Sequence, residues 1–132
     1  MQKVKYWIQA ARIQTLPLSI SGILVGSSFA YNINGFDNII FFLSIITAIS
    51  FQVLSNFAND YGDGILGTDN QRIGPDRVIA SGKLSLKELK KGIVINVFIS
   101  ITFSYSLIKY SFKSDYFLIL IFLILSISSI VA

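Results

Sequence analysis

The chain has 132 residues and a net charge of +4; 53% of its residues are hydrophobic and only 14% are charged. Soluble domains carry roughly a quarter of charged residues, so this composition predicts a membrane protein. The sequence has no cysteine and no histidine, which excludes disulfides, thiolate or imidazole metal ligands and histidine acid–base catalysis. Lysines and arginines are spread between apolar segments, so nucleic acid is not an expected partner.

Four apolar segments are long enough or apolar enough to cross a bilayer, which takes roughly 20 helical residues. They lie at about residues 15–31, 39–57, 92–108 and 116–132, and none contains a charged residue. They predict an all-α, polytopic transmembrane helix bundle that forms one domain. Because the fourth segment reaches the end of the chain, we expect this sequence to be part of a longer protein.

The first apolar segment has an alternative interpretation as a secretory signal peptide, since Lys3 and Lys5 precede it. Trp7 and Arg12 lie close to the segment, however, and no A-x-A cleavage site leads into a soluble domain. A membrane span is therefore the favoured interpretation.

The distribution of lysine and arginine predicts the orientation in the membrane. The N-terminal segment and the connection at about 58–91 carry nine of these residues, whereas the opposite connections carry only Lys109 and Lys113. We therefore expect a multi-pass protein of the cell (inner, cytoplasmic) membrane, with the N-terminus and the Asp-rich connection in the cytoplasm.

A helix start is encoded within the long connection. Ser85 and Glu88 have the spacing of a capping box, which predicts that the third spanning helix begins at Leu86. The lysines that follow are expected to anchor this helix at anionic lipid headgroups: Lys87, Lys90 and Lys91.

A polar stripe follows the second apolar segment. Its members are spaced by 4, 3, 1 and 3 residues and would share one helix face: Gln52, Asn56, Asn59, Asp60 and Asp63. Carboxylates at the edge of a membrane are costly unless they pair or bind a cation, so the stripe marks a candidate functional site.

Three glycines are then expected to break this helix: Gly62, Gly64 and Gly67. Asp69 follows the bend, and Arg72 and Arg77 come next. Aspartates together with arginines suit a diphosphate carried on Mg²⁺, because Mg²⁺ takes carboxylate and phosphate oxygens and arginine contacts phosphate in a bidentate manner. The alternative is that the aspartates cap the helix and pair with basic residues in a solvated loop.

Several motifs resemble the first half of UbiA-type intramembrane aromatic prenyltransferases: WIQAARIQTLPLSISGILVG, NDYGD, GTDN and RIGPDRVIASG. The similarity covers essentially the whole chain and is greatest to the menaquinone branch of that family. The resemblance implies a bundle of nine transmembrane helices, of which about four would lie here. It also implies two Asp-rich motifs that face each other across a central cavity.

The first Asp-rich motif of many relatives reads N-D-x-x-D-x-x-x-D. Gly67 stands at its last position here, and Asp69 is the next carboxylate. The resemblance implies Mg²⁺ ligands at Asn59, Asp60, Asp63 and Asp69, with Asp60 and Asp63 catalytic. The diphosphate contacts would be Asn56, Arg72 and Arg77, and two residues could lie on the acceptor side, Arg12 and Gln52. From the residues alone, Arg12 could equally reach the membrane interface, and Gln52 could bond a neighbouring helix.

The implied reaction transfers a polyprenyl group from an allylic polyprenyl diphosphate to an aromatic acceptor. In the menaquinone branch the acceptor is 1,4-dihydroxy-2-naphthoate, which loses its carboxylate to give a demethylmenaquinone. Acceptors of the 4-hydroxybenzoate, haem or chlorophyll type stay open, as does the oligomeric state.

The second Asp-rich motif has no counterpart in this sequence, so the chain alone is expected to be inactive. Two other classes of protein remain: a divalent-cation transporter or channel subunit, and a non-catalytic fragment. A transporter predicts carboxylates near the middle of the bilayer. Here the carboxylates follow the apolar segment and share a connection with two arginines, which favours the enzyme.

Overall fold

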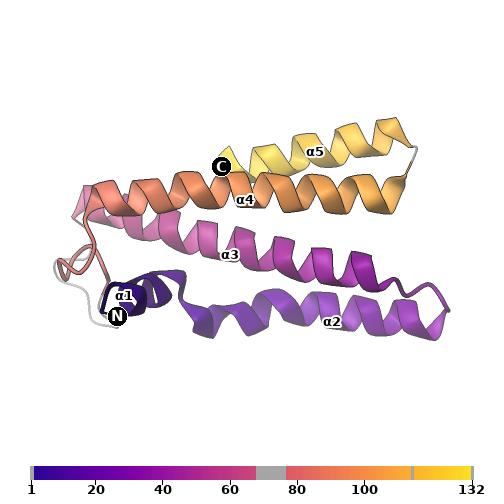
Figure 1. Ribbon diagram of the computed structural model, residues 1–132, viewed down its shortest axis with the longest axis horizontal. Helices are drawn as coiled ribbons and strands as arrows, with labels where there is room; N and C mark the ends of the chain where they lie inside the picture. Colours follow the sequence, from indigo (N-terminus) through magenta and orange to yellow (C-terminus); the bar gives the residue numbers. More distant parts are fainter. Residues whose placement is uncertain (1, 68–76, 114, 132) are drawn as a thin grey trace.

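The computed structural model describes residues 2–67, 77–113 and 115–131, with side chains through Ser128, and it confirms the all-α prediction (Figure 1). The elements are α1 (Gln2–Ala11), a 3₁₀ turn η1 (Ile13–Thr15), α2 (Leu16–Asn32), α3 (Asn38–Leu66), α4 (Leu86–Phe112) and α5 (Tyr116–Val131). The long helices α2, α3 and α4 run side by side, α5 folds back along α4, and α1 lies across one end.

Within the described residues, three helical stretches are long and apolar enough to cross a membrane. They are Gln2–Asn32, which combines α1, η1 and α2, then α3 and α4; the apolar part of α5, Tyr116–Ser128, is shorter. Large apolar side chains are exposed along α2 and α5, as expected for surfaces that face lipid or other helices. The polytopic bundle predicted from the sequence is therefore confirmed.

Helix α3 is longer than the predicted second span and runs without a break from Asn38 to Leu66. The expectation that three glycines break it is wrong for Gly62 and Gly64, which lie inside the helix. Gly64 allows close packing, because a Cβ atom there would lie 2.5 Å from Cγ2 of Ile79. Only Gly67 ends the helix, in the left-handed conformation (φ 67°) that glycine adopts without strain.

Helix α4 begins at Leu86, as predicted from the capping box. The Ser85 Oγ accepts from the Glu88 backbone N–H at 3.2 Å, and Glu88 Oε2 accepts from the Ser85 N–H at 3.0 Å. Lys3 Nζ donates to Glu88 Oε1 at 2.7 Å, which joins α1 to the start of α4.

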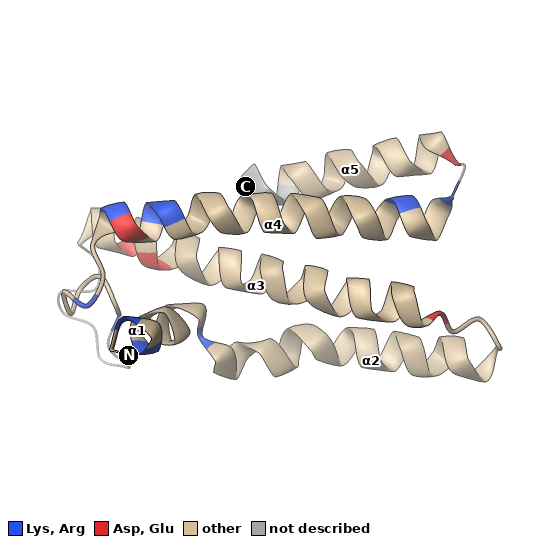
Figure 2. Cartoon of the chain, viewed as in Figure 1, with Lys and Arg blue, Asp and Glu red and all other residues tan. Residues whose placement is uncertain are grey.

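The hydrophobic core lies where α1, the C-terminal end of α3, residues 77–85 and the start of α4 meet; we call this region the charged end. Its buried members are Ala10, Phe57, Val78, Leu84 and Leu89. Trp7 packs edge-on against Phe57, with ring centroids 5.5 Å apart, and fills the space left by the missing side chain of Gly92. Figure 2 shows that blue and red residues gather at this end.

Small polar residues let α3 and α4 approach closely along their length. Ser50 of α3 and Asn96, Ser100 and Ser104 of α4 are buried. Asn96 Nδ2 donates to the Ser50 carbonyl at 3.0 Å, a bond between helices of the kind common in membrane bundles. This contact holds α3, and therefore the polar stripe, in a defined position.

Candidate functional site

The polar stripe of α3 divides into a buried edge and an open edge. Asn56 and Asp60 are buried, and Asp60 is only 2% exposed. Asn59 is exposed, and the Asp63 side chain retains 31% of its accessible surface. The residues predicted to act together therefore meet two different environments.

Two arginines from separate parts of the chain converge on the buried edge. Arg12 Nη2 and Arg77 Nη1 both donate to Oδ1 of Asp60. Arg77 Nη2 also forms an ion pair with Oδ2 of Asp63 at 3.0 Å. The arginine side chains are 24% and 12% exposed, so solvent screens these contacts less than it screens surface pairs. Arg12 and Arg77, singled out from the sequence for different reasons, belong to one cluster.

Arg12 stands at a sharp turn between α1 and η1. Its backbone is left-handed (φ 49°, ψ 60°), which is uncommon for a residue other than glycine. Asn56 holds this turn, because its Nδ2 donates to the Ala11 carbonyl at 2.9 Å and to Thr15 Oγ1 at 3.2 Å. Thr15 Oγ1 donates in turn to the Arg12 carbonyl at 2.9 Å.

The sequence predicts a diphosphate contact for Asn56, but in the structure its amide N–H groups bond the turn that carries Arg12. Thr15 was not recognised as part of the site, since a single threonine at the start of an apolar segment has no distinguishing pattern. The diphosphate contact of Asn56 stays a prediction.

Arg77 is held by a compact segment, residues 77–85. Ser81 donates to the Arg77 carbonyl twice, through its N–H at 3.0 Å and its Oγ at 2.7 Å. Val78 and Leu84 are buried in the core of the charged end, which fixes the segment against α1 and α3. Asp69 and Arg72, two further predicted site residues, lie outside the described residues.

Gln52 lies one helical turn deeper in the stripe. Its Oε1 accepts from Ser19 Oγ at 2.6 Å, which links α3 to α2. The structure thus confirms the alternative in which this amide bonds a neighbouring helix. An acceptor contact by Gln52 stays a prediction.

The open edge has the donor chemistry that suits Mg²⁺. Asn59 and Asp63 are four residues apart on α3, so their oxygen-bearing side chains lie one helical turn apart. Among the described residues no group of three or more acidic side chains could hold a metal ion. One or two protein carboxylates are sufficient for Mg²⁺ when substrate phosphates complete its coordination, so Asn59 and Asp63 fit such an ion.

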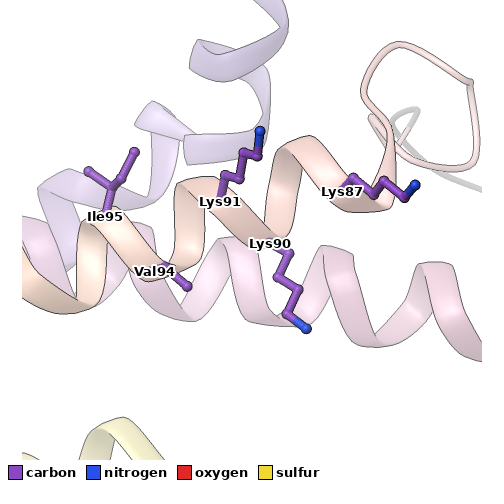
Figure 3. A pocket seen from close by; sticks show the side chains of 5 residues that line it. All are labelled: Lys87, Lys90, Lys91, Val94 and Ile95. Carbon is purple, nitrogen blue, oxygen red and sulfur yellow. The ribbon is translucent and has the colours of Figure 1, made fainter.

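A second basic region lies at the start of α4, outside this cluster (Figure 3). It is a groove lined by Lys87, Lys90, Lys91, Val94 and Ile95. The three lysine side chains point in different directions, so their ammonium groups do not converge on one anion. Anchoring at lipid headgroups stays a prediction for these residues.

Comparison with known proteins reveals a family and several relatives. The model of the UbiA prenyltransferase family matches residues 19–131. A 1,4-dihydroxy-2-naphthoate octaprenyltransferase from Haemophilus influenzae is 47% identical over 102 residues, which cover 75% of this chain and 33% of that protein. The protein of the same name from Escherichia coli is 39% identical over 98 residues, covering 74% and 32%. The one from Mycobacterium tuberculosis is 35% identical over 81 residues, covering 61% and 28%.

The chain thus spans about a third of the length of these curated relatives. No solved structure matches it.

Proposed function

Because the chain belongs to the UbiA prenyltransferase family, we propose that the whole protein transfers a polyprenyl group from an allylic polyprenyl diphosphate to an aromatic acceptor. The acceptor proposed is 1,4-dihydroxy-2-naphthoate, since relatives at 35–47% identity carry that substrate in their names. The C–O bond of the donor breaks, a C–C bond to the aromatic ring forms, and the overall reaction releases diphosphate and CO₂. The product is the hydroquinone form of a demethylmenaquinone, because the two ring hydroxyl groups of the acceptor are retained.

The observation that carries this proposal is the pair of arginines at the charged end. Arg12 and Arg77 meet at Asp60, and Arg77 also contacts the partly exposed Asp63. Guanidinium groups bind phosphate oxygens through paired N–H donors and stay charged at any physiological pH. They would bind the diphosphate and stabilise the negative charge that grows on it as the C–O bond breaks.

We also propose Mg²⁺ as the cofactor, with Asn59 and Asp63 among its ligands and Asp69 as a further candidate. When bound, the ion would neutralise charge on the diphosphate and make it a better leaving group. Arg72 is a further candidate for the diphosphate. A second cluster of aspartates from the rest of the protein would supply further ligands to the metal.

The charged end would lie on the cytoplasmic side of the membrane. Eight described basic residues belong to this end: Lys3, Lys5, Arg12, Arg77, Lys83, Lys87, Lys90 and Lys91. Lys109 and Lys113 lie near the opposite end of α4. The positive-inside rule then supports a cytoplasmic active site, where soluble diphosphate can leave.

The test is an acceptor comparison with the full-length protein in membranes or detergent. Prenyl transfer from a polyprenyl diphosphate would be followed by mass spectrometry with 1,4-dihydroxy-2-naphthoate and with 4-hydroxybenzoate. We expect a product from the naphthoate that has lost CO₂, and none once EDTA removes Mg²⁺. A product only from 4-hydroxybenzoate would contradict the proposed acceptor, and transfer to neither would contradict the proposed function.

A further inference from the structure

Asp60 is the most enclosed carboxylate of the described polar stripe. It is 2% exposed, and its Oδ1 accepts from the guanidinium groups of Arg12 and Arg77. The two arginines lie 48 and 17 residues away along the chain, one before α2 and one after α3. Asp60 is therefore the point at which three separate segments are joined by charge.

A metal ligand has different requirements. Its oxygen must face a space that the ion and its substrate can enter, and a cation is repelled by positive charges at the same oxygen. An ion at Oδ1 of Asp60 would have to displace Arg12 and Arg77 from a buried position. Asn59 and Asp63 lie on the open edge of the stripe, where an ion can approach. Asp63 is paired with Arg77 alone among the two arginines, through Oδ2 at 3.0 Å, and its side chain is 31% exposed, so less has to be displaced there than at Asp60.

The contacts of Arg77 show how a diphosphate could be received. Arg77 Nη1 donates to Asp60 and Nη2 pairs with Asp63, so the two nitrogens of one guanidinium group serve two different carboxylates. The Arg77 contact with Asp63 is the more accessible of its two ion pairs, so it is the one that a substrate can replace. The contact with Asp60 would persist throughout.

We propose that Asp60 is a positioning residue that holds Arg12 and Arg77 in place for the diphosphate and does not ligate the metal. This inference rests on the proposed function, because it names which groups of that site meet the diphosphate and which meet the ion. It assigns the two aspartates of the NDYGD segment different tasks: Asp63 binds the metal, and Asp60 orients the arginines.

The test separates metal binding from diphosphate binding in the full-length protein. Mn²⁺ replaces Mg²⁺ and its binding is measured by electron paramagnetic resonance, while a non-hydrolysable farnesyl thiodiphosphate is titrated without metal by calorimetry. For Asp60→Asn we expect analogue affinity to fall at least about tenfold while Mn²⁺ affinity changes less than about twofold. Asp63→Asn should weaken Mn²⁺ binding at least about tenfold.

Asp37→Asn, at the other end of α3, is the matched control and should change neither affinity. The inference is overturned if Asp60→Asn weakens Mn²⁺ binding as much as Asp63→Asn does. It is also overturned if Asp60→Asn leaves analogue binding unchanged.

Asp60→Asn leaves two partly buried arginines without their shared carboxylate, so the variant could fail to fold. Arg12→Gln is then used, because it keeps Asp60 paired with Arg77. We expect weaker analogue binding and unchanged Mn²⁺ binding, and unchanged analogue binding overturns the inference. Failure of the proposed function is recognised separately, since the wild-type protein would then show no prenyl transfer.

Discussion

The two ends of α3 each carry an aspartate, and the chain uses them in opposite ways. Asp37 caps the first turn, where its Oδ1 accepts from the N–H groups of Ile39 at 2.8 Å and Ile40 at 3.0 Å. These partners are close in sequence; among the described residues, its distant partner is Tyr110, whose Oη donates to Asp37 Oδ2 at 3.4 Å. Asp60 is buried and is bound by arginines from two distant segments.

This difference shows that contacts between distant segments of the chain gather at the charged end. At the charged end, apolar side chains from α1, α3, residues 77–85 and α4 form a core. At the other end, short connections join the helices, and Phe112 of α4 stacks on Phe122 of α5 with ring centroids 4.9 Å apart. A carboxylate that caps a helix needs only the backbone N–H groups of the first helical turn. A site for a charged substrate needs a rigid surrounding structure.

The largest expected effect is the loss of prenyl transfer in full-length Asp63→Asn. The substitution removes a charge that the proposed metal needs and little packing, so the rate should fall at least about 100-fold with normal membrane insertion. Asp37→Asn should keep near-normal activity. Steady-state assays on equal amounts of inserted protein make the comparison, and near-normal transfer by Asp63→Asn would refute the metal site.

A smaller effect is expected from glycines at the charged end. In Gly64→Ala the new Cβ would lie 2.5 Å from Ile79 Cγ2 and 3.2 Å from Ile79 Cβ, so residues near Arg77 must move. We expect a loss of about 1–3 kcal/mol in the free energy of unfolding, with reduced activity.

Gly62→Ala is the matched control for this packing. Among the described residues, no atom outside the local helix backbone lies within 4 Å of the added Cβ. The better helix propensity of alanine should therefore stabilise α3 by up to about 1 kcal/mol. Thermal unfolding in detergent would compare the two variants. Equal midpoints would show that close contact with Ile79 does not matter.

The smallest effect is expected at the other end of α3. Asp37→Ala removes the helix cap and should cost about 1 kcal/mol of stability without reducing the affinity for substrates. Chemical denaturation gives the free energy, and binding titrations give the affinity. A large drop in diphosphate affinity would show that the two ends of α3 are coupled and that Asp37 does more than cap the helix.

The sequence predicted those features that depend on neighbouring residues. The start of α4 at Leu86 followed from the capping box of Ser85 and Glu88, whose groups meet within one turn. The end of α3 was predicted too early, because helix-internal glycines weaken a helix only slightly when packing supports it. Gly64 has such support from Ile79 and Leu86.

The charge cluster could be predicted only in part. The spacing of Asn56, Asp60 and Asp63 placed them on one face, but it could not distinguish the buried edge from the open edge, which depends on where α1 packs. The contact of Arg12 with Asp60 spans 48 residues and requires a left-handed turn at Arg12 itself. No local pattern encodes such a contact. From the sequence, Arg12 could therefore equally lie on the acceptor side or reach the membrane interface.

Binding of the diphosphate by the arginines of the charged end is tested most directly with full-length Arg77→Ala. Calorimetric titrations would compare the affinities of a non-hydrolysable prenyl diphosphate analogue and of the aromatic acceptor, after thermal unfolding has confirmed that the variant is folded. We predict that affinity for the analogue falls at least about tenfold and that affinity for the acceptor is unchanged. An equal loss for both ligands, or no loss for the analogue, would contradict the role of this end as the diphosphate site.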